Sequence, residues 1–470
     1  MKTLFKSLTI LACLGVVALL SWAGLHNPFL WFDESGQFWI SLGLNHYSDT
    51  YATPGGIAEV IEGNRHYNLD PGGFSLLLYL WLKICNDSIV FLRLLPFLFF
   101  AALAVFTFWY TYRSRKNVVE ACLYTTLLFV WEVTANEMTE VRAYSMEMCG
   151  VVSTMCFLPA LHTGKNIQSR LFLLSVWLSF FCLSRYDFFI FAFSTALWVL
   201  SIVWLQRKSW GDFFAGSVLF AAPLLLTVGA VLLGMTSHQE PAGAAVTYQY
   251  IGTNPKVIFS PLVLFALANV LLIVRDIVRS ERIPDTHILF LIVFFVYFVL
   301  SALSLYPLDS RGSIGLTILL TVTLLERLIG GVKIPSLMKF LIILALCRLS
   351  QHMPISDYGS LSLDSDVLRE YVRTKENHKS DKVFIDYWMA PTIRHLYEYG
   401  DWKELAEQDG YPSRFCIQQD SDTAHVVMPD EVECDYYIIT RHTKMTKQYD
   451  MSPFRPVDDE SQYIYVKTKP

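Results

Sequence analysis

The chain has 470 residues, of which 53% are hydrophobic and only 17% are charged. A soluble globular protein has too little interior to bury so much apolar surface. The charge is also divided unevenly, because residues 1–350 carry a net charge of +3 and residues 351–470 carry −8. This composition excludes an intrinsically disordered chain and a nucleic-acid binder that depends on overall positive charge. We expect a membrane domain over residues 1–350 and a soluble domain over residues 351–470.

Apolar segments long enough to cross about 30 Å of hydrocarbon recur throughout the membrane domain. They predict an α-helical multi-pass protein with about eleven spans, by length alone, near residues 5–24, 89–111, 118–135, 143–161, 170–184, 187–206, 213–234, 257–274, 287–305, 312–330 and 337–350. The first span has the basic start of a signal peptide, but no convincing small-x-small cleavage site follows, so we expect it to be retained. Residues 72–85 are apolar but too short to cross, and predict an interfacial or half-inserted helix.

Basic residues predict the orientation of the spans, because cytoplasmic loops carry an excess of Lys and Arg. A cytoplasmic N-terminus puts the short basic turns on the cytoplasmic side; they include Arg113, Arg115, Lys116, Arg170, Arg207, Lys208, Arg275 and Arg279. An odd number of crossings then places the C-terminal domain outside the cytoplasm, at the cell (inner) membrane. Cys416 and Cys434 would lie where a disulfide is permitted, but their spacing leaves both a disulfide and two free thiols open.

The first outer loop, residues 25–71, contains an Asp-Glu pair, Asp33-Glu34, among aromatic residues directly after a span. Aromatic residues favour the membrane interface, and a carboxylate in such partly apolar surroundings can serve as a base. Taken alone, the pair has a simpler interpretation, in which Asp33 caps a short helix over residues 35–44.

Other outer segments carry polar residues at the ends of spans. Asp70 precedes Pro71-Gly72-Gly73, where it can be a turn former only. Glu140 and Arg142 flank the start of another span, where they can be a solvated ion pair. Arginines on the outer side run against the positive-inside tendency, and an anionic phosphate group would explain them; the candidates are Arg142, Arg185 and Arg311. Snorkelling to lipid phosphates is the alternative.

The order of these motifs resembles a known class of membrane enzyme. The acidic pair Asp33-Glu34 is followed by the turn at Asp70, the Arg-Leu-Leu-Pro segment over residues 93–96, and the motif Glu140-x-Arg142-x-Tyr144. Together with many spans and a soluble C-terminal domain, this resembles the GT-C glycosyltransferases of the protein-mannosyltransferase and aminoarabinose-transferase type. The similarity is best over residues 1–210. Asp70-Pro71-Gly72-Gly73 departs from the His-Pro-Pro or Lys-Pro-Pro of many members, and Gly312 follows Arg311 where an Arg-Tyr pair is common.

The resemblance implies transfer of a sugar from a polyprenyl-phosphate donor to a glycan, lipid or protein acceptor on the outer face of the membrane. Asp33 would be the base of an inverting displacement, Glu34 would orient Asp33 or the acceptor, and Glu140 would be a further carboxylate. Substrate-binding residues would be Asp70, Arg142, Tyr144, Arg185 and Arg311. Some relatives bind a divalent cation near the acidic residues, which His66 or His238 would assist, but no tight ligand spacing is present and we assign no metal ligand.

The C-terminal domain alternates strand-like runs at residues 382–387 and 435–440 with helix-like stretches at residues 364–375 and 391–399, which predicts a small α/β unit. The aromatic run over residues 386–391, with Tyr397 and Tyr399, suits either sugar stacking or core packing, and packing is the simpler interpretation. A transporter or flippase of lipid-linked saccharides is the alternative function. It would have charged residues deep within spans and inverted repeats. A lipid-linked-oligosaccharide ligase or polymerase would have its large outer loop in the second half of the membrane domain.

Overall fold

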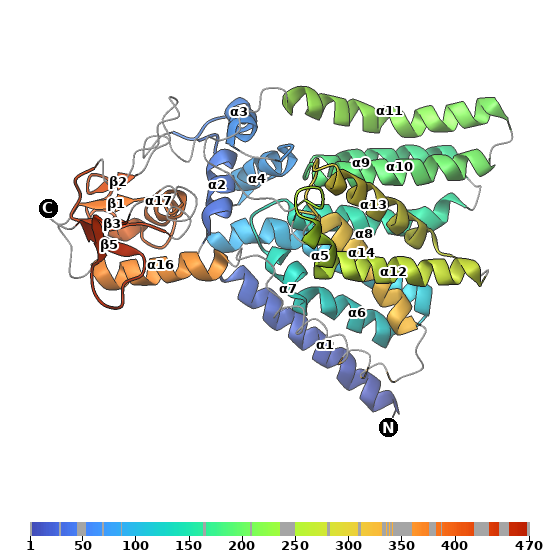
Figure 1. Cartoon of the computed structure of the whole chain (residues 1–470), viewed down its shortest axis with the longest axis horizontal. Coiled ribbons are helices and arrows are strands. Elements are labelled where there is room, and N and C mark those ends of the chain that lie inside the picture. The colour runs from blue at the N-terminus through green and yellow to red at the C-terminus, as the bar shows by residue number, and fades with distance from the viewer. Residues whose placement is uncertain are drawn as a thin grey trace.

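The computed structural model of the chain describes residues 2–27, 30–44, 53–67, 70–85, 87–162, 166–206, 209–235, 250–279, 283–308, 312–330, 335, 338, 341, 360–375, 382–386, 388–417, 432–440 and 451–467. Helices dominate up to residue 330, and a small sheet lies near the C-terminus (Figure 1). A mostly helical fold with a small sheet near the C-terminus is therefore confirmed.

Ten of the predicted spans correspond to helices: α1 (Lys2–Leu25), α5 (Ile89–Arg115), α6 (Val118–Val130), α8 (Tyr144–Leu161), α9 (Ile167–Cys182), α10 (Asp187–Gln206), α11 (Trp210–Met235), α12 (Pro261–Val278), α13 (Asp285–Ala302) and α14 (Ile314–Gly330). Among the described residues, seven helices are long and apolar enough to cross a membrane, namely α1, α5, α8, α10, α11, α12 and α13. They indicate a membrane-embedded protein. The number of crossings stays a prediction, and residues 337–350, apart from Met338 and Leu341, lie outside the described residues.

Helix α8 is the centre of the bundle and packs against α5, α9 and α14. Its sequence has no single apolar face, and buried residues occur on all sides of the helix, as expected of a helix surrounded by others. Gly150 makes the close contact with α9 possible, because a Cβ at this position would lie 2.6 Å from the ring of Phe181. By contrast, α1 and α11 expose rows of large apolar side chains, which suits a lipid-facing surface.

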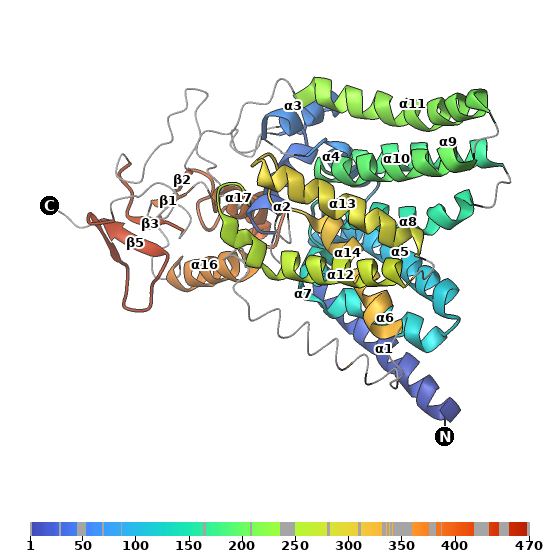
Figure 2. The ribbon, with the colours of Figure 1, turned by 45° about the vertical axis from the view of Figure 1, so that its right-hand side comes forward.

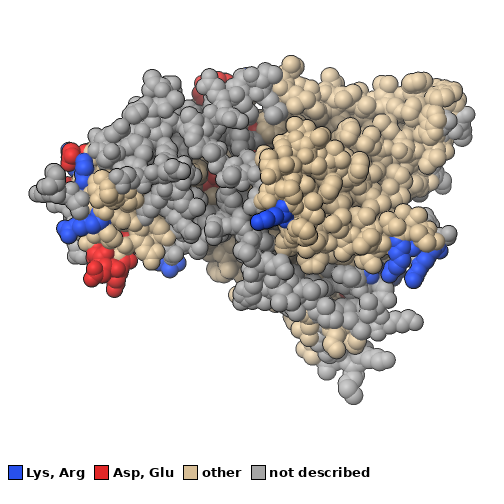
Figure 3. Space-filling model, in the orientation of Figure 1, with Lys and Arg blue, Asp and Glu red and all other residues tan. Residues whose placement is uncertain are grey.

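The turns with the predicted cytoplasmic basic residues lie at one end of the bundle, away from the C-terminal domain (Figures 1 and 2). Interactions between helix ends link this region: His162 lies 2.9 Å from Asp285, and Arg327 pairs with Asp276. Figure 3 shows Lys and Arg at this end and a broad face of the bundle without charged atoms. The clustering agrees with the predicted orientation, while the side of the membrane on which each end lies stays a prediction.

Three short helices lie between the bundle and the C-terminal domain: α2 (Phe32–Ser41), α3 (Ile57–Tyr67) and α4 (Gly73–Ile84) (Figure 1). Helix α4 is the segment predicted as interfacial or half-inserted, and it packs against both α2 and α3. Two one-turn elements, α7 (Glu132–Ala135) and η1 (Asn136–Met138), lead into α8, and η2 (Pro255–Phe259) leads into α12.

The C-terminal domain has a five-stranded sheet in the order β2-β1-β3-β5-β4. Its strands are β1 (Val383–Ile385), β2 (Phe415–Ile417), β3 (Tyr436–Ile438), β4 (Phe454–Pro456) and β5 (Ile464–Lys467), and its helices are α16 (Ser360–Lys375), α17 (Ala390–Glu398) and η3 (Lys403–Leu405). Strand β1 pairs in parallel with β2 and β3, whereas β5 pairs antiparallel with β3 and β4. The two predicted strands and two predicted helices are confirmed. Cys416 and Cys434 are free thiols.

Helix α17 joins the C-terminal domain to the membrane domain by packing on α2, as both ribbon views show (Figures 1 and 2). Trp39 is fully buried there, donates a hydrogen bond to the carbonyl oxygen of Pro391 (3.1 Å), and lies 4.4 Å from the guanidinium of Arg394. Tyr399 meets Trp39, and Trp388 meets Phe32. These aromatic residues of the predicted sugar-stacking run therefore serve packing.

Trp39→Ala tests this contact. The substitution removes a buried ring, its hydrogen bond and its cation–π contact, and we expect a loss of about 3–5 kcal/mol in the free energy of unfolding. Denaturant titration of the purified protein in detergent measures it. Trp22→Ala is the matched control, because Trp22 is 65% exposed on α1. Equal losses in the two variants would contradict the docking of α17 on α2.

Candidate functional site

Helix α2 begins three residues earlier than the sequence analysis predicts, at Phe32. Trp31 is the N-cap residue, and the carboxylate of Glu34 accepts a hydrogen bond from the Trp31 N–H (3.2 Å). The interpretation of Asp33 as the cap is therefore wrong. Glu34 performs this task because it stands at the third helical position, from which a glutamate reaches back to the N-cap residue. Asp33 is left to interact elsewhere.

Glu34 is the anchor of the loop that carries Asp33. Its two carboxylate oxygens accept hydrogen bonds from Arg93 (2.7 and 3.1 Å), and one also accepts from the Val141 N–H (2.9 Å). Arg93 donates further bonds to the carbonyl oxygens of Thr139 and Asn27. Both side chains of the pair are buried, with exposed fractions of 0% for Glu34 and 2% for Arg93. Burial raises the pKa of Glu34, and Arg93 counters this effect.

This geometry bears on the two predicted roles of Glu34, which were to orient Asp33 or the acceptor. A carboxylate with no exposed surface and with both oxygens in hydrogen bonds is compatible with the first role and not placed for contact with an acceptor. Glu34 ties the start of α2 to α5 through Arg93, and to the turn before α8 through Val141. The Arg93 side chain is likewise buried in the protein and does not reach lipid phosphates.

Asp33 begins a row of alternating charges that runs from the surface into the protein. Its carboxylate lies 3.2 Å from Arg142, whose guanidinium lies 3.5 Å from Asp70; Asp70 in turn lies 3.5 Å from Arg185. Arg185 then lies 3.4 Å from Glu147. The two ends of the row differ in burial: the exposed fraction of the side chain is 28% at Asp33, between 7% and 15% at the three residues that follow, and 0% at Glu147. The structure thus brings together Asp33, Asp70, Arg142 and Arg185 from four separate segments.

Asp70 reaches the row through an unusual turn. Asn64 on α3 donates a hydrogen bond to the Asp70 carbonyl oxygen (2.8 Å), and Gly72 has a φ of +92°, a backbone conformation that favours glycine. The next N–H, of Gly73, donates to the carbonyl oxygen of Leu183 (3.0 Å), and a Cβ at Gly73 would lie 2.4 Å from the Leu183 side chain. The two glycines therefore let this turn approach the turn that carries Arg185, and Asp70 is more than a turn former.

Tyr144 supports the arginines. The ring is 5% exposed, and the guanidinium groups of Arg185 and Arg142 lie 4.2 and 6.0 Å from its centroid. Tyr144 thus makes cation–π contacts with both arginines, and its contact with a substrate stays a prediction. Glu140 is also buried, and its charge acts on both Glu34 and Arg142. Arg142 pairs with Asp33 and Asp70, so it does not belong to a solvated pair with Glu140 as its counter-ion.

Both arginines of the row remain cations. Burial lowers the pKa of Arg142, but Asp33 and Asp70 raise it more. Burial also lowers the pKa of Arg185, and Tyr144, Glu147 and Asp70 outweigh that effect. Two guanidinium groups side by side near the protein surface can bind a phosphate with planar, charged donors.

The sequence analysis missed two acidic residues at the inner end of the row, Glu147 in the first turn of α8 and Asp187 at the start of α10. Both are fully buried, and the hydroxyl of Tyr297 on α13 donates a hydrogen bond to Asp187. A usable signal was present, because an ionisable residue within an otherwise apolar span marks a functional site by default.

Three predicted residues are not tested. Arg311 and His238 lie outside the described residues, as does the side chain of His66. Within the described part of the chain, no group of three or more His, Cys, Asp or Glu side chains could hold a metal ion.

Arg93→Met tests the anchor. The substitution leaves the Glu34 carboxylate buried without its counter-ion, and we expect a loss of about 3–5 kcal/mol in the free energy of unfolding. Arg65→Met is the matched control: Arg65 pairs with Glu62 at the surface, with exposed fractions of 38% and 58%, and its loss is expected to stay below about 1 kcal/mol. Denaturant titration in detergent compares the two. A loss of unfolding free energy in Arg93→Met no larger than that in Arg65→Met would contradict the anchoring role of the Glu34–Arg93 pair.

Chemically, the row offers one carboxylate with access to solvent and two cations directly behind it. This is the set of groups needed to remove a proton from a hydroxyl beside a bound anion.

No protein-family model matches the sequence, and no curated protein matches it significantly.

Proposed function

We propose that the protein is a membrane glycosyltransferase of the GT-C type. It moves a sugar from a polyprenyl-phosphate donor to a hydroxyl of a glycan, lipid or protein acceptor on the extracytoplasmic face. The observation that carries the proposal is the contact between the partly exposed Asp33 and Arg142, at 3.2 Å, in a row that continues to Asp70 and Arg185.

The proposed reaction is a single inverting displacement. The Asp33 carboxylate takes the proton of the acceptor hydroxyl, and the acceptor oxygen forms a bond to the anomeric carbon of the sugar. The bond between that carbon and the phosphate oxygen breaks, and the polyprenyl phosphate leaves with the bonding electrons. Arg142 and Arg185 stabilise the charge that develops on the phosphate. A phosphate is a good leaving group, so the reaction needs a base and cations more than an acid.

The location of the row supports a lipid-linked donor. It lies at the ends of α8 and α10 and beside the interfacial helix α4, where a polyprenyl chain can stay in hydrocarbon while its phosphate meets Arg142 and Arg185. Positions near helix ends also favour an enzyme over a transporter, because a transporter would place such charges near the middle of the bilayer. The C-terminal domain packs on α2 close to Asp33, so the acceptor would approach near this contact.

Asp33→Asn tests the base. We expect transfer to fall by about 10²- to 10⁴-fold, the usual contribution of a positioned base, with unchanged expression and membrane insertion. The host gene is deleted, and surface glycolipids and glycoproteins are compared by mass before and after complementation. The wild-type gene is expected to restore the missing sugar residue, whereas the Asp33→Asn variant is expected not to restore it.

Asp212→Asn is the matched control, because Asp212 is exposed at the start of α11, at the other end of the bundle. It is expected to restore the sugar fully. Full restoration by Asp33→Asn would exclude Asp33 as the base, and a deletion that changes no surface glycan would overturn the proposed transfer.

Single-cysteine reporters test the orientation. Burial raises the pKa of Cys434 to about 12, so the native thiol reacts slowly, and Ser413→Cys in the C-terminal domain is the better reporter because Ser413 is exposed. We expect an impermeant maleimide to label this cysteine in intact cells or spheroplasts. Ser209→Cys, exposed in the turn before α11, is expected to react only after permeabilisation. The reverse pattern would overturn the predicted sidedness.

A further inference from the structure

The two buried carboxyl groups at the inner end of the row form a pair that the proposed reaction does not use. Glu147 on α8 and Asp187 on α10 are both 0% exposed and lie within hydrogen-bonding reach of each other. Both carboxyls lie next to Gly315 on α14: a Cβ there would be 2.9 Å from Glu147 Oε1 and 3.8 Å from Asp187 Oδ2. In the described part of the chain, neither of these two oxygens has a hydrogen-bond partner at normal geometry. The Gly315 N–H and the Tyr306 hydroxyl are the other donors close to Asp187.

Two ionised carboxylates are acceptors only and cannot bond to each other. A proton on one of them supplies the missing donor and removes a charge that would be costly to bury. The charged and titratable groups that face the pair are Arg185, Asp70, Tyr297 and Tyr306. Only Arg185 is a cation, and it also contacts Asp70. Two carboxyls beside a guanidinium suit a proton better than a metal ion, which needs more oxygen ligands and no adjacent cation.

The ion pairs of Arg185 determine how readily it can bind an anionic ligand. In this structure its Nη1 lies 3.4 Å from Glu147 Oε2, and its Nε lies 3.5 Å from Asp70 Oδ1. An anion that binds Arg185 has to compete with both carboxylates. The row from Asp33 to Asp187 contains four acidic and two basic side chains. With one proton shared by Glu147 and Asp187, its negative charges still outnumber its positive ones, and a bound phosphate adds to that excess.

We propose that Glu147 and Asp187 form a proton-binding site that controls Arg185, so that an anionic lipid head group binds at Arg142 and Arg185 together with uptake of one proton by this pair. The second proton neutralises Glu147 and weakens its hold on Arg185, which turns to the anion. Loss of that proton restores the bond from Arg185 to Glu147 and favours release of the carrier phosphate. This proposal rests on the anion site of the proposed function.

The test is calorimetric titration of the full-length protein in detergent with a fifteen-carbon prenyl sulfonate, whose own charge is constant between about pH 5.5 and 8.5. Repeating it in buffers of different ionisation enthalpy counts the protons taken up. We expect close to one proton to be taken up for each ligand bound. The affinity is then expected to fall as the pH rises, by at most about tenfold per pH unit. Glu147→Gln and Asp187→Asn are each expected to bind with no such pH dependence.

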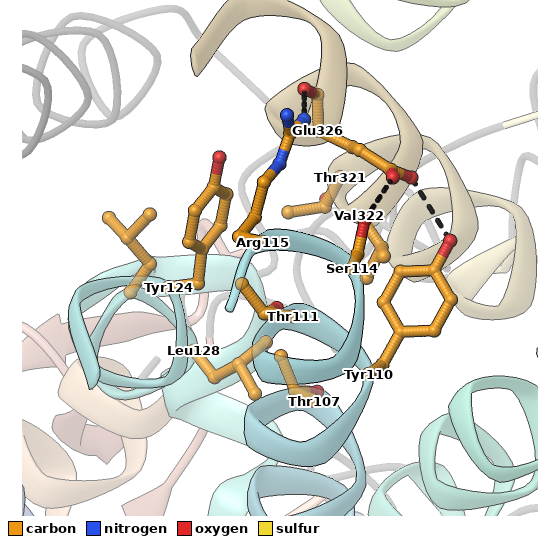
Figure 4. Close-up of a pocket in the computed structure, with 11 residues that line it drawn as sticks. Thr107, Tyr110, Thr111, Ser114, Arg115, Tyr124, Leu128, Thr321, Val322 and Glu326 are labelled. Carbon is orange, nitrogen blue, oxygen red and sulfur yellow. Dashed lines mark hydrogen bonds between the residues drawn. The ribbon is translucent and has the colours of Figure 1, made fainter. Parts of the chain in front are cut away.

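Glu326→Gln is the matched control. Glu326 is a carboxylate on α14, at the opposite end of the bundle, where it accepts hydrogen bonds from Tyr110 (3.0 Å) and Ser114 (3.0 Å) beside a small pocket (Figure 4). Because it does not contact the row, this variant is expected to keep the wild-type proton uptake.

The outcomes separate the two proposals. Wild-type binding without proton uptake, or uptake that persists in both variants, overturns the proton site and leaves the anion site standing. Absence of binding at every pH overturns both. If neither variant folds, the infrared difference spectrum of the wild type decides: a protonated carboxyl band that grows on binding supports the proposal, and its absence overturns it.

Discussion

The buried ion pair between Glu34 and Arg93 is the interaction on which the candidate site depends. Asp33 and Glu34 are neighbours in the first turn of α2, so fixing one fixes the direction of the other. Glu34 is held by Arg93 on α5 and by the Val141 N–H in the turn before α8, and this turn also carries Arg142. One buried carboxylate therefore fixes both partners of the contact between Asp33 and Arg142. The two adjacent acidic residues therefore have separate roles: Glu34 anchors the start of α2, whereas Asp33 has access to solvent.

The opposite side of α2 is held by a different part of the chain. Trp39 and Phe38, near the end of the helix, pack against Arg394, His395 and Tyr399 of the C-terminal domain. His395 is fully buried there, and burial lowers its pKa to about 3. A histidine with a lowered pKa stabilises the folded state when it is neutral, and this stabilisation is lost as the pH falls from about 6.5 toward 3. The soluble domain thus forms part of the support of Asp33, and acid weakens that support.

The sequence predicts the elements better than it predicts their roles. Ten helices at predicted spans, the short helix α4 and the strand–helix order around α17 follow from apolar run length and residue pattern, which are local properties. The site residues Asp33, Asp70, Arg142 and Arg185 were also predicted, because charges at span ends are conspicuous in an apolar sequence. Their partners were not. Nothing local shows that Glu34 faces Arg93, 59 positions later, or that Asp70 bridges Arg142 and Arg185. Glu147 and Asp187 are also charges near the ends of spans, but they were not assigned to the site, because nothing local in the sequence shows that the two carboxyls lie beside each other.

The row of charges also means that, without a ligand, both arginines are already paired with carboxylates. Arg142 and Arg185 are each shared between two carboxylates at 3.2–3.5 Å, and buried guanidinium groups without such partners would be costly. An arriving phosphate has to replace carboxylates, and its binding free energy is the difference between two sets of ion pairs. Replacement at Arg142 frees Asp33, the outermost acid, to accept a proton. In the proposed reaction, the phosphate of the donor would thus release the base Asp33 when it binds, and proton abstraction would be limited while no donor is bound.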